Sequence, residues 1–270
     1  MQSSLPMIRL VCSITTASSL LLSAQAAAQD IELTVRVRNE RSSVVSGAQV
    51  CGLLPIAEGG VGSRWHISGS PALQSRVDGY CLALGDFGPY QSQAVHLNWS
   101  KSAGVEQVGA PEYPLVDQPS AELQTLAASF ASYPQGERPR RIFDWMVDNI
   151  EFIGIRRAVD GAEYALAQRR GDCTEHMLLA AELLARNGFS VRRVLGVAIP
   201  TGQNRIRASD LHNWVEYSDN RGWRIFDSSR RVLSEPGGLR YISLLHYHNN
   251  QQLSVAPITT DGQGLKLYLE

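Results

Sequence analysis

The sequence contains very little lysine and no strong excess of either charge. Only Lys101 and Lys266 occur, so arginine supplies nearly all of the positive charge among 25 basic and 26 acidic residues. A formal net charge of −1 lacks the basic excess that is the electrostatic signature of nucleic-acid binding. We therefore expect no nucleic-acid partner, and we infer no function from the scarcity of lysine itself.

Long hydrophobic runs are missing after the first 28 residues. Residues 1–28 contain Arg9, a mostly apolar stretch from Leu10 to Ala24, and then small residues at the spacing that signal peptidase recognises. Serine and threonine interrupt this stretch, which is shorter than the about 20 apolar residues of a membrane-spanning helix. The pattern predicts a signal peptide over 1–28 and a mature chain that begins near Ala27 or Gln29. We expect an exported protein, periplasmic or secreted, with no membrane association after cleavage.

Cysteine is scarce as well. Cys12 lies in the predicted signal peptide, which leaves Cys51, Cys81 and Cys173 in the mature chain. Export generally means an oxidising compartment, in which disulfides form and persist. One economical solution pairs Cys51 with Cys81 and leaves Cys173 as a free thiol. The alternative is that all three are reduced and buried, because a free cysteine behaves as a small hydrophobic residue.

The first part of the mature chain has the pattern of an antiparallel β-sheet domain. An alternating apolar and polar run begins at Ile31, and four further short runs follow between glycine- and proline-rich turn signals. Five short strands predict a small β-sandwich over residues 29–100. We expect His66 and His96, which lie in these strands, to pack or face solvent rather than bind a ligand. The irregular segment 101–118 is the expected linker.

From Pro119 the apolar residues recur with a helical period. Helices are expected over about 119–131 and 139–150, and a shorter helical piece over 161–169. Asp144 and Asp148 lie four residues apart and could mimic a metal site, but a solvated helix face explains them better.

A cysteine opens the next helix. Asp172 is a good N-cap residue and Glu175 completes a capping box, which places Cys173 at the first helical position. Because unpaired amides at a helix N-terminus favour negative charge, we expect the pKa of the Cys173 thiol to be lowered. The Cys173 N–H could also bind an oxyanion. Gly188 is the expected left-handed stop, and a buried strand follows it.

Two strand-like runs, 212–217 and 222–227, flank turn residues and predict a β-hairpin. If Tyr217 pairs with Gly222, His212 falls directly opposite Asp227, close enough for the carboxylate to hold the imidazole in one tautomer. A slip of one residue would put the two side chains on opposite faces. A cysteine at a helix start, a histidine and an aspartate together indicate nucleophilic acyl transfer. In this scheme Cys173 attacks, His212 carries the proton and Asp227 orients His212.

Several neighbours could support such a site. Gln168 or Tyr164 could lend a second oxyanion donor, and Trp214 could line a substrate groove. Ordinary helix-surface and core positions explain these residues equally well or better. Further side chains have the same two interpretations: His176 as a competing base or as packing, Trp223 as groove or core, and Arg169 and Arg170 as thiolate partners or solvated arginines.

Three sequence blocks in this order resemble the bacterial transglutaminase-like superfamily: G-D-C-T-E-H from Gly171, H-N-W-V-E-Y from His212 and G-W-R-I-F-D from Gly222. The resemblance covers about Ser120 to Ser229. It assigns the catalytic cysteine, histidine and aspartate of the family to Cys173, His212 and Asp227. More weakly, the N-terminal strands are similar to sandwich domains that precede this core in some bacterial members. We therefore expect an α+β protein, with an antiparallel β-sandwich followed by a papain-like, transglutaminase-like core over 119–270.

The resemblance indicates the catalytic residues better than the reaction, because the superfamily includes peptidases, amidases, acyl transferases and members with no demonstrated activity. A cysteine thioester leads to hydrolysis when water attacks and to transfer when an amine attacks. The expected substrate is a peptide, protein or cell-wall amide, and the scheme needs no cofactor or metal. Two alternatives remain open: an exported binding module that keeps the fold without turnover, and a zinc protein with Cys173, His176, His212 and Asp227 as ligands.

Overall fold

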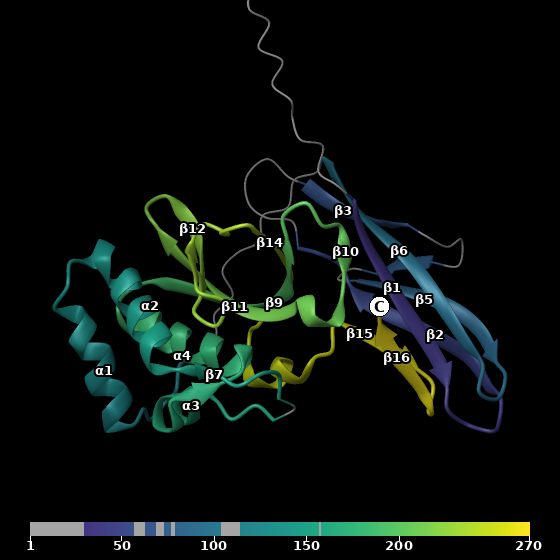
Figure 1. Ribbon diagram of the computed structural model, residues 1–270, viewed down its shortest axis with the longest axis horizontal. Helices are drawn as coiled ribbons and strands as arrows, with labels where there is room; N and C mark the ends of the chain where they lie inside the picture. The colour runs from purple at the N-terminus through teal and green to yellow at the C-terminus, as the bar shows by residue number, and fades with distance from the viewer. Residues whose placement is uncertain (1–29, 57–62, 69–72, 77–78, 104–113, 157) are drawn as a thin grey trace, which may run out of the picture.

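The protein is an α+β structure in which the helices gather at one end and two β-sheets at the other (Figure 1). It is known from a computed structural model that describes residues 30–56, 63–68, 73–76, 79–103, 114–156 and 158–270. The predicted signal peptide, with Cys12, and residues 104–113 of the predicted linker lie outside the described residues. Among the helices of the described part, none is both long and apolar enough to cross a membrane.

Two sheets at the N-terminal end share one apolar core. One has the strand order β10-β1-β6-β3, with β16 also paired to β1, and the other has the order β15-β2-β5-β4. The strands are β1 (Ile31–Asn39), β2 (Val45–Leu53), β3 (Ser63–Ser68), β4 (Leu73–Arg76), β5 (Gly79–Phe87), β6 (Ser92–Ala103), β10 (Arg205–Ile206), β15 (Ile258–Asp261) and β16 (Leu265–Leu269).

The C-terminal end of the chain returns to these N-terminal sheets. β16 runs antiparallel to β1, and β15 runs antiparallel to β2. The division made from the sequence ended the sandwich at residue 100 and placed everything after 119 in a second domain. The structure differs, because β6 continues to Ala103 and strands after residue 200 extend both sheets. Periodicity in 265–269 is compatible with an edge strand, but it does not indicate which strand becomes its partner.

A disulfide joins the two central strands of the second sheet. Cys51 and Cys81 lie directly opposite each other on β2 and β5, and they are bonded. This confirms the predicted pairing, and the alternative of three reduced cysteines is wrong. Cys173 is the free cysteine of the described residues, and it is buried.

The helices pack around one buried helix, α4 (Cys173–Arg186). The others are α1 (Ala121–Ala131), α2 (Arg138–Asn149) and α3 (Ala162–Gln168), and their apolar stripes form one core with α4. Ser120 caps α1 by accepting a hydrogen bond from the Leu123 N–H. Gly188, at φ +87° just after the C-cap of α4, is the left-handed stop that the sequence predicts.

A five-stranded sheet lies between the helices and the N-terminal sheets, with the order β13-β12-β11-β9-β14. Its strands are β9 (Ser190–Pro200), β11 (Leu211–Asp219), β12 (Gly222–Asp227), β13 (Val232–Ser234) and β14 (Leu239–His246). Leu195 of β9 packs in the helical core, whereas Val197 and Ile199 of the same strand pack in the core of the N-terminal sheets. Strand β9 therefore joins the two parts of the molecule. A short parallel pair, β7 (Glu151–Phe152) and β8 (Arg170–Gly171), precedes α4.

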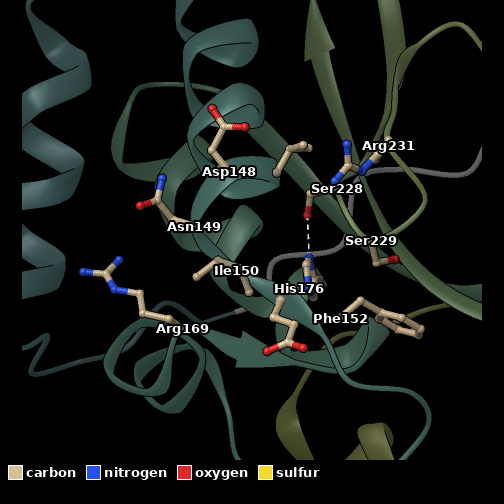
Figure 2. Close-up of a pocket in the computed structure, with 11 residues that line it drawn as sticks. Asp148, Asn149, Ile150, Phe152, Arg169, His176, Ser228, Ser229 and Arg231 are labelled. Carbon is tan, nitrogen blue, oxygen red and sulfur yellow. Dashed lines mark hydrogen bonds between the residues drawn. The ribbon is translucent and has the colours of Figure 1, made fainter.

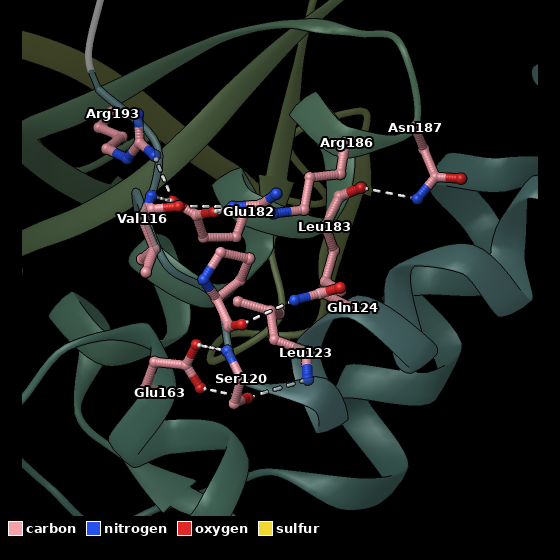
Figure 3. Close-up of polar contacts among 11 residues, drawn as sticks. Val116, Ser120, Leu123, Gln124, Glu163, Glu182, Leu183, Arg186, Asn187 and Arg193 are labelled. Carbon is pink, nitrogen blue, oxygen red and sulfur yellow. Dashed lines mark hydrogen bonds and ion pairs between the residues drawn. The ribbon is translucent and has the colours of Figure 1, made fainter.

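Buried charges fix the far end of α4 (Figure 3). Glu182 forms ion pairs with Arg186, at 3.0 Å, and with Arg193 of β9, at 3.5 Å. It also accepts a hydrogen bond from the Val116 N–H, and Arg186 donates to the Val116 carbonyl. These bonds tie the end of the linker and strand β9 to the same helix, so the cysteine end of α4 is carried on an anchored element.

Candidate active site

The N-terminus of α4 is organised by two buried carboxylates. Asp172 is the N-cap, its Oδ1 accepts from the Thr174 N–H at 2.7 Å, and the Glu175 side chain accepts from the Asp172 N–H at 3.1 Å. This is the predicted capping box, and Cys173 is the first helical residue. The second oxygen of Asp172 accepts from the Arg156 N–H at 2.9 Å. The cap therefore also binds the loop before α3.

The protonation of Cys173 differs from the sequence-based expectation. Burial raises the pKa of the thiol to about 11, and the carboxylate of Asp172 acts in the same direction. A hydrogen bond from the backbone of Asn213 and one from the Thr174 side chain oppose the shift without reversing it. The expected lowering by the helix N-terminus is wrong because desolvation and the capping carboxylate outweigh the helix amides. With this pKa Cys173 is a neutral thiol near pH 7.

A candidate base lies on the neighbouring strand. His212 Nε2 lies 2.7 Å from Asp227 Oδ2, and both side chains are buried. Asn213, the residue after His212, donates its backbone N–H to the Cys173 sulfur. Strand β11 therefore brings His212 to the start of α4, and the structure gathers the three predicted residues in one place.

The strand register that produces this contact is not the predicted one. Asp219 pairs with Gly222, and Tyr217 pairs with Arg224 rather than with Gly222. The turn is tighter than expected because the Asp219 side chain accepts from the Arg221 N–H at 2.8 Å and Gly222 adopts φ +108°. The shift is two residues, so His212 and Asp227 stay on one face and meet as diagonal rather than direct neighbours.

Asp227 is surrounded by hydrogen-bond donors. Its Oδ2 accepts from His212 and from the Tyr241 hydroxyl, at 2.8 Å, and its Oδ1 accepts from the Ser229 hydroxyl, at 2.7 Å, and the Arg230 N–H, at 3.1 Å. Burial alone would raise the pKa of Asp227, but the bonds from His212, Ser229 and Tyr241 lower it below its ordinary value. Asp227 is therefore an ionised carboxylate that accepts hydrogen bonds and donates none.

The tautomer of His212 follows from this arrangement. Because Asp227 accepts, His212 Nε2 carries a proton and donates it to the carboxylate. In the neutral ring this leaves Nδ1 with the lone pair. Nδ1 is the atom that can take a proton from the Cys173 thiol. Trp214, which lies in the core, is stacked with the imidazole of His212, and the ring centroids are 6.4 Å apart.

The remaining predicted neighbours lie in ordinary structural surroundings. Gln168 is exposed at the last position of α3, and Tyr164 lies under the Arg156 guanidinium, 5.3 Å from its ring centroid. Trp214 is 1% exposed and lies in the core rather than along a groove. Trp223 is covered by the Arg192 guanidinium. Arg169 pairs with Glu122 and lies over Trp145, and Arg170 is exposed in β8.

His176 lines a pocket next to the site (Figure 2). Its Nδ1 lies 2.8 Å from the Ser228 hydroxyl, and burial lowers its pKa. Phe152, Ser229 and Arg231 line the same pocket, which has a volume of about 300 Å³. His176 thus lies in the wall of a pocket beside the candidate site, with Ser228 as its hydrogen-bond partner. In the described part of the chain no cluster of histidine, cysteine and acidic side chains has the arrangement of a metal site.

A family comparison covers the segment that holds all three residues. Residues 124–228 match the family model of the transglutaminase-like superfamily. The chain carries a transglutaminase-like core. No curated protein sequence matches the chain.

Several solved structures are similar to this protein. A proposed cysteine protease from Cytophaga hutchinsonii is 15% identical over 90% of this chain and 91% of that chain, with a TM-score of 0.48. Calcium-bound LapG from Legionella pneumophila is 13% identical over 50% of this chain and 82% of that chain, with a TM-score of 0.36. The periplasmic domain of TgpA from Pseudomonas aeruginosa is 15% identical over 74% of this chain and 88% of that chain, with a TM-score of 0.36.

Four residues around Cys173, His212 and Asp227 were not anticipated from the sequence. Tyr241 and Ser229 hold Asp227, and Asn213 and Tyr247 connect β11 to its surroundings. Ser229 lies only two residues after Asp227, so a check of hydroxyls near the aspartate could have found it. Tyr241 and Tyr247 lie on and just after β14, and no local pattern indicates that this strand pairs with β9 beside the site.

Proposed function

We propose that the protein is an exported cysteine-dependent enzyme that hydrolyses or transfers acyl groups at amide bonds. The observation that carries this proposal is the hydrogen-bonded His212–Asp227 pair beside a free cysteine at a helix N-terminus. A buried imidazole whose Nε2 is held by a carboxylate has Nδ1 free to accept a proton. That is the requirement for activating a neutral thiol.

The proposed reaction proceeds through a thioester. The Cys173 thiol proton moves to His212 Nδ1 as the sulfur attacks the amide carbon, and the backbone N–H of Cys173 faces the oxyanion that forms. The C–N bond breaks, and His212 returns the proton to the departing amine. Water or another amine then attacks the thioester, with His212 as base, and the thiol is restored.

The high thiol pKa fits this order of events. With a pKa of about 11, Cys173 is a neutral thiol near pH 7, so the thiolate forms only when proton transfer and attack are coupled. The Asp227 carboxylate stabilises the imidazolium that results, as in other triads. His212 and Asp227 therefore supply the charge separation that the helix N-terminus alone does not supply.

The proposed location is the periplasm or the exterior of the cell. The disulfide between Cys51 and Cys81 supports it, because such bonds persist in oxidising compartments. Within such a compartment the proposed substrates are peptide, protein or cell-wall amides.

A non-catalytic binding module is the second candidate, and one observation favours it. Cys173 is buried and its pKa is raised, as for an inert structural thiol. The two candidates differ in what Cys173 does during turnover.

The test is incubation of the purified mature protein with a defined peptide library, with and without added amines, and product analysis by mass spectrometry. The enzyme proposal expects cleaved or amine-exchanged products that disappear in Cys173→Ala. Asp144→Ala is the matched control, because Asp144 is exposed on α2 and pairs only loosely with Arg140, at 3.7 Å. The proposal would be contradicted if the native protein formed no such products, or if Cys173→Ala formed the same amount of them.

A further inference from the structure

A short segment that begins at the last residue of β7 and leads to α3 exposes an unusual amount of apolar surface. Four of its side chains are large, apolar and exposed: Phe152 at 46%, Ile153 at 36%, Ile155 at 73% and Val159 at 42%. Ile155 is the most exposed large apolar side chain in the described part of the chain. Single exposed apolar residues are ordinary, but a group of them on one short segment indicates a surface that contacts something.

The backbone of this segment is bound to the start of α4. The Ile153 N–H donates to the Gly171 carbonyl at 3.1 Å, and the Arg156 N–H donates to Asp172 at 2.9 Å. The Asp160 N–H donates to Glu175 at 2.9 Å. The two carboxylates that cap the cysteine helix therefore also hold the segment in place. Its backbone is thereby fixed to the residues on either side of Cys173.

At its beginning the segment reaches the pocket beside the triad. Phe152 lines this pocket with His176 and Ser229, and its ring centroid lies 6.2 Å from that of His176 (Figure 2). Ser229 is the residue whose hydroxyl donates to Asp227. Phe152, the first residue of the segment, thus shares a pocket with a side chain that is hydrogen-bonded to Asp227.

We propose that residues 152–155 form an apolar docking strip for the substrate, and that this substrate is an extended peptide with a bulky apolar side chain near the amide that Cys173 attacks. The proposal rests on the proposed function and adds the substrate class to it. Two observations select this occupant: the hydrogen bond of Ile153 to Gly171, two residues before Cys173, and the pocket that Phe152 shares with Ser229. Contact with an apolar side chain would bury surface that the free protein leaves in water.

The experiment uses two peptidyl vinyl sulfones that differ only in one residue, leucine in one and serine in the other. Intact-mass measurements give the second-order rate of Cys173 alkylation by each. The leucine probe should react about tenfold faster, the order expected when one large apolar side chain leaves water. Ile155→Ser should remove most of this preference, and Phe152→Ser should reduce it. Val44→Ser is the matched control, because Val44 is 56% exposed next to β2, in the N-terminal sheets.

Equal rates for the two probes, reaction with neither, or an unchanged preference in Ile155→Ser would overturn the docking strip. A concentration-dependent dimer that dissociates in Ile155→Ser, with no change in preference, would assign the strip to self-association and would also overturn it. Failure of the proposed function is seen separately, as peptide turnover that survives Cys173→Ala. Turnover that needs Cys173 but ignores the apolar residue would reject the strip alone.

Discussion

Asn213 Nδ2 donates a hydrogen bond of 2.9 Å to Thr174 Oγ1. Thr174 follows Cys173 on α4, and Asn213 follows His212 on β11, so this bond joins the two elements beside the proposed nucleophile and base. The Tyr247 hydroxyl donates to Asn213 Oδ1 at 3.1 Å and orients the amide. The spacing of the thiol and the imidazole therefore depends on side chains outside the triad.

Asn213→Ala should lower kcat about tenfold, with a smaller change in KM, because one hydrogen bond of ordinary strength that positions the reacting groups is lost. Thr174→Val should have at least as large an effect, because it also removes the hydrogen bond of the Thr174 side chain to Cys173. The double variant should lose little more than Thr174→Val alone, because both changes break the bond between Asn213 and Thr174. Steady-state kinetics on the three variants measures this. Fully additive losses would show that Asn213 and Thr174 act independently.

Asp227→Asn should lower kcat on the order of ten-thousandfold while the protein stays folded, because an amide can stabilise neither the Nε2–H tautomer nor the imidazolium in the same way. Tyr241→Phe is the graded comparison. It removes one donor from Asp227 Oδ2, so kcat should fall only about tenfold. Loss of the Tyr241 hydroxyl should also raise the pKa of Asp227 toward its ordinary value. The acid limb of the plot of kcat against pH should then move to higher pH. An unchanged profile in Tyr241→Phe would contradict this role.

Cys173 should react slowly with iodoacetamide at pH 7 in the absence of substrate, more slowly than a free cysteine derivative under the same conditions. Burial raises its pKa to about 11, so the reactive thiolate is a minor species until the pH approaches that value. The rate should increase steadily between pH 7 and 10. Rapid alkylation at pH 7 would show that the helix N-terminus and His212 outweigh burial.

His246 should make the fold sensitive to acid. Burial lowers its pKa from 6.5 to about 4, with the positive charge of Arg192 as a second cause. Above pH 6.5 the residue is neutral in both the folded and unfolded states. Below that pH the unfolded chain binds the proton first, so the free energy of unfolding falls as the pH drops toward 4, by up to about 3 kcal/mol. Urea unfolding at pH 7 and pH 4.5 should show a smaller difference in His246→Gln. His248→Gln should reduce the difference only slightly, because the charge of His248 is the last of the three causes that lower the pKa of His246.

Local features of the candidate site could be predicted from the sequence. The capping box at Asp172 and Glu175 involves residues three apart, and Gly188 acts at its own position, so both depend on short-range chemistry. The pairing of Cys51 with Cys81 could be predicted because only three cysteines follow the predicted signal peptide, and these two lie in the same predicted domain. The meeting of His212 with Asp227 was predicted on the correct face, because a register error of two residues preserves the face.

Features that depend on distant parts of the chain could not be predicted. The register of β11 and β12 depends on how tightly Asp219 and Gly222 close the turn. The raised pKa of Cys173 depends on its burial, and the donor from Tyr241 depends on β14 pairing with β9. The return of β16 to β1 joins residues more than 200 positions apart. Periodicity describes which face of a strand is buried, and not what covers it.

The central claim is that Cys173 forms a covalent thioester during turnover. The most direct measurement is rapid acid quenching of the protein with a peptide mixture that it consumes, followed by intact-mass analysis and peptide mapping. The account predicts an added acyl mass on the peptide that contains Cys173, lost on treatment with hydroxylamine and absent in Cys173→Ala. Turnover of the same peptides by Cys173→Ala, with no adduct on the native protein, would contradict it.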